Sequence, residues 1–568
     1  MDKSLKGWIS PQIAIVHPSS RGVSEGNNAV TFRMRHGPKI FEIFSCEEHY
    51  EFVSMPNMTK NNEKIPAVVR RVGISFIGGA AAIIMLSAIL GTVHGQAFEI
   101  SGSEQPAAGT WQRLVNQPTF LCDTALLLTD GRVMVHQYGD PNHNGQGMNN
   151  WWALTPDVNG SYLNGTWSQL ASMSSSYGPL YFASAVLPDG RVIVEGGEYN
   201  FLIGVETNQG AIYNPVTNIW TTVNPPVGWS QIGDAPGAVL DNGTFTIGDI
   251  FSRRQVLFNA ITLTWTTTGT GKADNFSEEG FCKLPSGKLL LVDTANGTNS
   301  ELYDPATGLW SSAGSTVVRL PDAGSLEIGP HIQRPNGTSV AFGGTVHNAI
   351  YTFSTGTWTA ATDFPNGNDM ADAPCAVLPN GNVLVATSPG IFQTPVTFFT
   401  FDGTTFTQAP ATLTSASLTS YQERFLLLPT GQVLSVVADG LHIDAELFTG
   451  TGRPDPAWRP NITSVPATLT RGTTVQISGT QFNGLSAGSD YGDDCTNATN
   501  YPLVRITNQA SRHVFYARTH DHSTMGIATG SAIVSTMVDI PTNAETGTSR
   551  IQVVANGIPS GAKRVTIQ

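Results

Sequence analysis

Hydrophobic and polar positions along most of this chain follow one recurring unit, in which two apolar strands flank a turn that contains glycine. The clearest copy runs from Tyr181 to Gly197 and has the sequence YFASAVLPDGRVIVEGG. A Pro-Asp-Gly turn between two short apolar runs is typical of a β-hairpin. The pattern therefore predicts short antiparallel strands along the chain.

Seven copies of the unit can be aligned on their turn glycines. These glycines are Gly131, Gly190, Gly243, Gly287, Gly337, Gly381 and Gly431, and the gaps between them are 59, 53, 44, 50, 44 and 50 residues. A period of about 50 residues is typical of the blades of a kelch-type β-propeller. The sequence therefore predicts seven blades of four strands each.

A second signature with two aromatic residues follows several of the turns, as in Tyr213 to Trp220 and Tyr303 to Trp310. Its Asn/Asp-Pro and Thr-Gly dipeptides are turn formers, so we expect it to join the third and fourth strands of a blade. The tryptophans could form a sugar-stacking surface. Packing between neighbouring blades is the favoured interpretation, because large aromatics dominate the burial of apolar surface in cores.

The two ends of the repeat region complement each other. The segment around Trp111 has the outer-strand signature without inner strands, and the copy around Gly431 stops at Pro454 before its outer strand. We expect the Trp111 segment to complete that last blade, because ring closure removes exposed sheet edges. From Arg459 on, short strands separated by Gly, Asn and Pro indicate an immunoglobulin-like sandwich.

The predicted fold class is all-β, with a seven-bladed kelch-type propeller in residues 98–458 and an immunoglobulin-like (E-set) sandwich in 459–568. Residues 1–57 lack the repeat pattern and are expected to be a disordered or non-native extension, with translation starting at Met58. Residues 58–97 combine basic residues, a long apolar run and a Gly-Gln-Ala end. This is typical of a secretory signal cleaved after Ala97, although the apolar run is long enough to span a bilayer as an uncleaved anchor.

Composition narrows the range of partners. The formal net charge of −13 argues against a nucleic-acid partner, which would need a basic surface. Five cysteines are too few and too scattered for a disulfide scaffold. We expect a secreted monomer, extracellular or periplasmic, without stable membrane contact once the signal is cleaved.

Candidate chemistry gathers nine residues before each turn glycine, where the inner strand of a blade is expected to begin near one mouth of the central channel. These positions hold Cys122, Tyr181, Asp234, Glu278, Ile328, Asp372 and Gln422. Polar residues are common at strand ends, which would also explain the acids. If Asp234, Glu278 and Asp372 converge, they favour a cation or a polyhydroxylated ligand such as a carbohydrate.

The positions of Cys122 and Tyr181 resemble those of two residues in the galactose oxidase and glyoxal oxidase family of copper-radical enzymes. The resemblance to this family covers residues 98–568. The resemblance implies a thioether bond between these two residues that serves as a radical cofactor. Tyr199, after Gly196-Gly197, matches the aromatic residue that shields this radical. Tyr421 precedes a Leu-Leu-Leu-Pro-Thr-Gly run and matches the axial copper ligand and base.

The resemblance also implies that Tyr181 binds the copper and that His520 is an equatorial ligand. One ligand departs from the family pattern, because Gln422 stands where the family has its other histidine. An amide oxygen is a weaker copper(II) ligand than imidazole. His522 could take that place, since alternate residues of a strand share a face.

Two functions follow from these observations. The first is a copper-radical oxidase that converts primary alcohols, sugars or aldehydes and releases hydrogen peroxide. The second is a non-catalytic propeller that binds carbohydrate or a cell-surface partner through its acidic channel mouth. Propellers host many functions, so fold alone does not choose between them.

Overall fold

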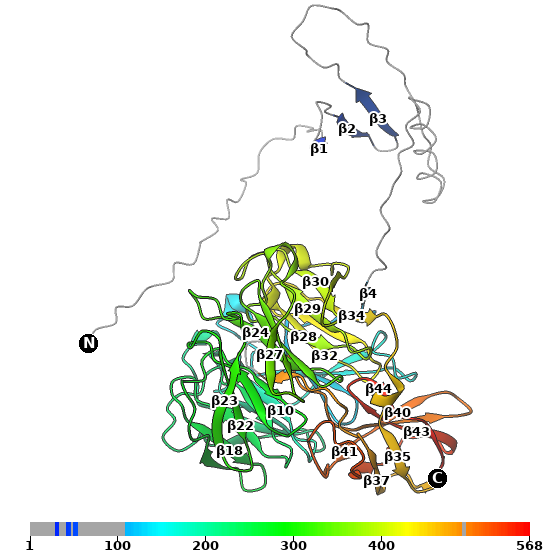
Figure 1. The fold of residues 1–568 in the computed structure, drawn as a ribbon. Helices are drawn as coiled ribbons and strands as arrows, with labels where there is room; N and C mark the ends of the chain where they lie inside the picture. The colour runs from blue at the N-terminus through cyan, green and yellow to red at the C-terminus, as the bar shows by residue number, and fades with distance from the viewer. Residues whose placement is uncertain (1–28, 33–40, 47–48, 55–107, 491–495) are drawn as a thin grey trace, which may run out of the picture. The chain divides into compact units, whose positions relative to one another are not determined.

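The computed structural model describes residues 29–32, 41–46, 49–54, 108–490 and 496–568 (Figure 1). Their regular elements are β-strands and short 3₁₀ turns. No helix in this part of the chain is long and apolar enough to cross a membrane. The chain divides into two compact units, Met1–Ser103 and Glu104–Gln568.

The first unit contains three strands that the sequence analysis did not predict. They are β1 (Ala29–Phe32), β2 (Phe41–Cys46) and β3 (His49–Ser54), and they form an antiparallel sheet in the order β1-β2-β3. The predicted signal segment, residues 58–97, lies outside the described residues.

The second unit contains the predicted blades as separate antiparallel sheets. The first blade is β5 (Cys122–Leu127), β6 (Val133–Gln137), β7 (Trp151–Thr155) and β8 (Thr166–Gln169). The second is β10 (Ala183–Val186), β11 (Val192–Glu195), β14 (Gly210–Asn214) and β15 (Ile219–Val223). The third is β16 (Gly237–Val239), β17 (Phe245–Gly248), β18 (Gln255–Asn259) and β19 (Thr264–Thr268).

Four further sheets complete the set. The fourth blade is β20 (Phe281–Lys283), β21 (Leu289–Val292), β22 (Asn299–Asp304) and β23 (Leu309–Ser315). The fifth is β24 (Ile328–Gln333), β25 (Thr338–Gly343), β26 (Asn348–Thr352) and β27 (Thr357–Ala360). The sixth is β28 (Cys375–Val377), β29 (Val383–Thr387), β30 (Thr397–Phe401) and β31 (Phe406–Gln408). The seventh is β32 (Glu423–Leu427), β33 (Val433–Val437), β34 (Ala445–Gly450) and β4 (Gly109–Arg113).

The blades form a closed ring, as the sequence predicts. The first strands of consecutive blades contact each other from β5 through to β32, and β32 contacts β5. The strand β4 pairs with β34, with Trp111 opposite Phe448, which confirms that the Trp111 segment completes the last blade. The Trp111 ring lies 5.2 Å from the ring of Phe398 and 5.0 Å from that of Phe448, so β4 is held by packing as well as by its ladder.

Turn chemistry explains why the same residue types recur. All seven turn glycines have φ between 77° and 87°, a left-handed conformation that side-chain-bearing residues rarely adopt. The outer tryptophans bind the preceding blade. The Nε1 of Trp310 donates to Gln255 of the third blade, and the Nε1 of Trp358 donates to Ser300 of the fourth. Packing between blades is therefore the role of these tryptophans.

A two-sheet sandwich follows the propeller. One sheet is β35 (Asn461–Ser464), β37 (Thr474–Thr480), β42 (Val534–Asp539) and β41 (Thr519–His520). The other is β36 (Thr468–Leu469), β45 (Lys563–Ile567), β43 (Gly547–Ala555), β39 (Leu503–Asn508) and β40 (Val514–Ala517), with β44 (Ile558–Pro559) paired to β43. Side chains from both sheets share one buried core that includes Ile477, Val504, Val538 and Ile551.

The sandwich covers the end of the propeller where the turn glycines lie. The backbone N–H of Thr519 donates to the carbonyl of Thr129, and that of Met525 donates to the carbonyl of Asp241, both in such turns. A sandwich segment also runs along the inner strands. Its strand β38 (Ser489–Asp490) pairs with β20. The mouth at which the inner strands begin is therefore the end away from these turn contacts.

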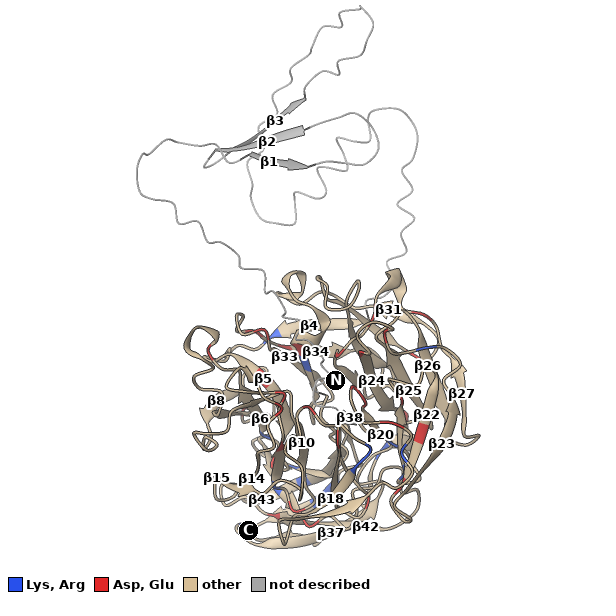
Figure 2. Ribbon diagram, turned by 90° about the vertical axis from the view of Figure 1, so that its left-hand side faces the viewer, with Lys and Arg blue, Asp and Glu red and all other residues tan. Residues whose placement is uncertain are grey.

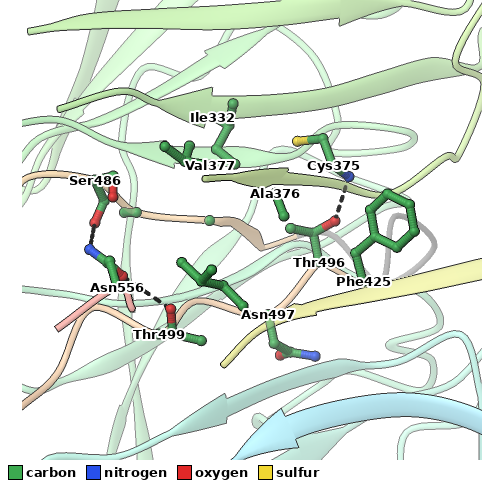
Figure 3. Close-up of a pocket in the computed structure, with 13 residues that line it drawn as sticks. Ile332, Cys375, Ala376, Val377, Phe425, Ser486, Thr496, Asn497, Thr499 and Asn556 are labelled. Atoms are coloured by element: carbon green, nitrogen blue, oxygen red, sulfur yellow. Dashed lines mark hydrogen bonds between the residues drawn. The ribbon is translucent and has the colours of Figure 1, made fainter. Parts of the chain in front are cut away.

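Residues from Thr496 on, where the described chain resumes, continue the contact with the inner strands. Thr496 accepts a hydrogen bond from the backbone N–H of Cys375 (Figure 3), and Asn497 donates to the carbonyl of Ala125. The small cavity that remains between them, about 20 Å³, has room for a single water molecule. The segment thus fills space between the inner strands.

Candidate functional site at the propeller mouth

The residues that begin the inner strands share an unusual backbone conformation. Tyr181, Glu278 and Asp372 occupy the same repeat position and have φ of 53°, 59° and 50°. Left-handed conformations of this kind are strained for residues with long side chains and concentrate at functional sites. The same left-handed conformation therefore recurs before the inner strand in three of the blades.

Carboxylates from neighbouring blades form one wall of the mouth, called here the acidic wall. Glu278, Glu327 and Asp372 come from the starts of the fourth, fifth and sixth blades, and each offers an oxygen within 4.8 Å of the others. Asp234 begins the third blade, and the charge of Glu278 acts on it. The structure thus brings Glu278 and Asp372 together with their neighbour Glu327, and Asp234 lies near enough to feel the charge of Glu278. Acidic residues are distributed along the ribbons of this unit (Figure 2).

Burial and mutual repulsion raise the pKa values of Glu327 in the acidic wall and of Glu198, Glu206 and Asp234, which feel the charge of Glu278 directly or through a neighbour. Burial and the charge of Glu206 raise the pKa of Glu198 to about 7, and burial and the charge of Glu278 do the same for Glu206. Burial and Glu278 raise the pKa of Glu327 to about 8. Burial raises the pKa of Asp234 well above its usual range. Near neutral pH the wall therefore holds both protonated and ionised carboxyl groups, which supplies hydrogen-bond donors as well as acceptors.

Three tyrosines at the same end of the ring, Tyr181, Tyr199 and Tyr421, are called here the tyrosine wall. The short strand β12 (Tyr199–Asn200) pairs with β9 (Pro179–Leu180), which places Tyr199 beside the residue that precedes Tyr181. The rings of Tyr181 and Tyr199 are 6.0 Å apart in an edge-on arrangement. Tyr421 contacts the ring of Phe392 at 4.9 Å. All three tyrosines are half-buried, so part of each ring remains accessible.

A buried ionic network supports the tyrosine wall, and the sequence analysis did not find it. The guanidinium of Arg424 lies 5.7 Å from the centroid of the Tyr181 ring, and its Nε is 3.3 Å from Oδ1 of Asp123. The other oxygen of Asp123 lies 2.9 Å from Nδ1 of His136, whose Nε2 faces the carbonyl of Met148. Both ring nitrogens of His136 therefore face oxygen atoms, and the ring is held between Asp123 and the backbone.

Charge balance in this network fixes the state of Asp123. Burial alone would raise the pKa of Asp123, but the hydrogen bond from His136 and the charge of Arg424 hold it below its usual value. Arg424, Asp123 and His136 are all fully buried. The sequence offered one sign of this network, because Asp123 directly follows Cys122 and Arg424 lies three residues after Tyr421. Only the fold brings Asp123 and Arg424 together.

Cys122 and Gln422 lie at the mouth end without forming the expected copper site. Cys122 is buried, its Sγ contacts the carbonyl of Phe120, and burial and the charge of Asp123 raise the pKa of its thiol well above the usual range. Gln422 ends the 3₁₀ turn Ser420–Gln422, and its Oε1 accepts a hydrogen bond from the backbone N–H of Thr419. The amide thereby caps its own turn.

The structure does not bring His520 or His522 to the mouth. His520 lies on β41 and faces carboxylates of the sandwich, with Nε2 3.2 Å from Asp539 and Nδ1 2.8 Å from Asp521. The Nδ1 of His522 faces the hydroxyl of Thr536, and its backbone N–H donates to Pro188 at the turn after β10. Tyr181 lies before the start of β10, whereas Pro188 lies in the turn after its end. The sandwich docks on the turn end of the ring, so His522 lies at the end of β10 away from Tyr181.

The expected copper donors therefore do not assemble among the described residues. Tyr181 and Tyr421 lie at the mouth, but the two histidines lie at the turn end and the Gln422 amide is engaged in its own turn. Copper(II) sites in proteins depend on imidazole or thiolate donors in a compact geometry. The described residues do not fit this metal.

The chain is similar to several solved structures at low sequence identity. No protein-family model matches the chain, and no curated protein matches it in sequence. Among solved structures, it is similar to a fungal alcohol oxidase of the AA5 family in complex with copper, at 15% identity, covering 81% of this chain and 100% of that one with a TM-score of 0.48.

A second similar structure is a catalytically inactive virginiamycin B lyase from Staphylococcus aureus with quinupristin. Its identity is 9%, the coverage is 60% of this chain and 99% of that one, and the TM-score is 0.42. The copper and the quinupristin belong to those proteins.

Proposed function

We propose that this protein is a binding propeller that holds a polyhydroxylated ligand, a carbohydrate, at its mouth. The observation that carries the proposal is the meeting of Glu278, Glu327 and Asp372, from three blades, at the same end of the ring as Tyr181 and Tyr199. Aromatic faces stack on the apolar faces of sugar rings, while carboxyl groups bind the hydroxyls. Export through the signal predicted in residues 58–97 would expose this mouth to extracellular glycans.

The mixed protonation of the acidic wall supports a neutral, hydroxyl-bearing ligand. Glu198, Glu206 and Glu327 have pKa values of about 7, 7 and 8, so each can donate or accept near neutral pH. A sugar hydroxyl is itself both donor and acceptor, so it can pair with either form. Such a wall binds hydroxyl groups without the full cost of gathering ionised carboxylates.

The test is a panel of neutral oligosaccharides screened by array and measured by calorimetry, in the presence of a chelator. We expect Tyr199→Ala and Glu278→Gln each to weaken the best binding by about tenfold or more, which corresponds to roughly 1.4 kcal/mol. The matched control is Asp130→Asn, which changes a carboxylate in a turn at the sandwich end. If no saccharide binds, or if the control weakens binding as much as the mouth variants, the proposal fails.

Copper-radical oxidation of alcohols or aldehydes is the second candidate. The contact between Tyr199 and Tyr181 favours it, because the resemblance places a shielding aromatic residue there. Peroxide release from alcohols, sugars and aldehydes by copper-loaded protein tests it directly. It ranks second because His520 and His522, the two histidines that the resemblance offers as copper ligands, lie at the turn end of the ring.

A further inference from the structure

The buried guanidinium of Arg424 lies among the starts of the inner strands. The resemblance implies that copper ligands occupy these same strand starts. We infer that the side chain of Arg424 takes the place of the metal, so that the mouth of this propeller is copper-free by construction and its tyrosines are ligand-binding surfaces. The inference concerns the metal alone and holds whether or not the ligand is a carbohydrate.

The guanidinium contacts all three of the relevant strand starts. In the first blade, Nε of Arg424 is 3.3 Å from Asp123, the residue after Cys122. Before the second blade, the Tyr181 ring lies 5.7 Å from the guanidinium carbon. In the seventh blade, Nη1 donates to the carbonyl of Tyr421. One fixed cation thus lies beside the neighbours of Cys122 and beside both tyrosines.

Arg424 is locked in this position. Its side chain is 0% exposed, as is that of Asp123, and Asp123 is itself held by His136. A buried ion pair is costly to break, because removal of one partner leaves an uncompensated charge. A divalent cation placed beside the guanidinium would meet strong repulsion, since charges interact strongly where water is excluded. The electrostatics beside the two tyrosines therefore oppose copper at that point independently of the missing histidines.

The turn that carries Gln422 adds a second obstacle. The side chains of Thr419 and Gln422 form a reciprocal cap on the turn Ser420–Gln422. This cap fixes the direction in which residue 422 leaves the backbone. The loss of the copper site therefore involves more than one substitution, because Arg424 lies beside both tyrosines whatever residue occupies position 422.

The experiment compares the full-length protein with two variants after incubation with copper and air. Copper content is measured by elemental mass spectrometry after dialysis, and the peptides that hold Cys122 and Tyr181 are measured by peptide mass spectrometry. We expect the wild type and Gln422→His to retain no stoichiometric copper and to yield the two peptides separately. We expect the double variant Gln422→His with Arg424→Ser to bind copper at least about tenfold more tightly than Gln422→His alone.

Two results would overturn the inference. One is stoichiometric copper, or a cross-linked Cys122–Tyr181 peptide, in the wild type. The other is tight copper binding by Gln422→His with Arg424 intact. The copper content and the peptides of the wild type need no folding control. They therefore test the inference even if the double variant does not fold. Carbohydrate binding is measured on the same wild-type sample, so failure of the proposed ligand is seen separately from the presence of copper.

Discussion

At the scale of single residues, a buried lysine organises the blade that supplies Glu278. The ammonium of Lys272 is 0% exposed and lies 2.5 Å from Asp274, 3.1 Å from Glu279 and 2.7 Å from Glu301. Burial alone would lower the pKa of Lys272, but the charges of these carboxylates hold it well above its usual value. One cation thus neutralises part of a carboxylate cage directly behind the acidic wall.

Replacing this lysine should be strongly destabilising. Lys272→Met leaves the buried carboxylates without their cation, and we expect the free energy of unfolding to fall by about 3–5 kcal/mol. The control is Lys288→Met in the same blade, since Lys288 is 40% exposed and pairs with Asp304 at the surface. Its effect should stay below about 1 kcal/mol. Equal midpoints of denaturant unfolding for the two variants would contradict this role of Lys272.

At the scale of elements, β4 is the strand on which ring closure depends. It comes from the start of the second unit, far in sequence from its partner β34, and Arg113 adds an ion pair of 2.7 Å with Asp444. Without β4, the edge of β34 would lose its ladder partner. Exposed strand edges pair with other chains.

Two truncations test the closure. A chain that begins at residue 104 keeps β4, and we expect it to remain monomeric with unchanged thermal unfolding. A chain that begins at residue 114 lacks β4, and we expect a lower unfolding midpoint and association in size-exclusion chromatography. Identical behaviour of the two chains would show that β4 is dispensable.

At the scale of the whole molecule, buried acids that favour the neutral form set the pH dependence of stability. Burial raises the pKa of Glu195 well above its usual range and that of Glu423 to about 8. Glu327, with a pKa of about 8, belongs to the same set. The folded protein therefore binds more protons than the unfolded chain between the ordinary glutamate pKa and about 8.

Stability should therefore fall as the pH rises through this window. Each raised pKa contributes stability that is complete below the unfolded value and is lost as the pH passes the folded value. We expect a lower urea midpoint at about pH 8.5 than at about pH 5.5, and a flatter dependence for Glu195→Gln. Glu545→Gln is the control, because its pKa is lowered by Ser511 and His513. A midpoint that rises across this range would contradict the assignment.

Much of the fold follows from local sequence. The period of about 50 residues, the turn glycines at positive φ and the outer strand near Trp111 are all present in the structure. They could be predicted because turn chemistry and strand alternation involve neighbouring residues. The three acids of the mouth could be predicted for a related reason, since equal distance from a repeated turn places residues at equal depth in the ring.

What only the tertiary structure decided is where individual side chains at the mouth turn and which distant residues meet. Arg424 and Asp123 are 301 positions apart and pair inside the ring. Gln422 caps its own turn. His520 belongs to the sandwich, which docks at the other end of the inner strands. Sequence spacing fixes the depth of a strand residue, but the direction of a side chain and the docking of a second domain depend on packing across the whole molecule. The sequence by itself therefore determined a closed propeller with an acidic mouth, and the tertiary structure determined that a guanidinium lies beside its tyrosines.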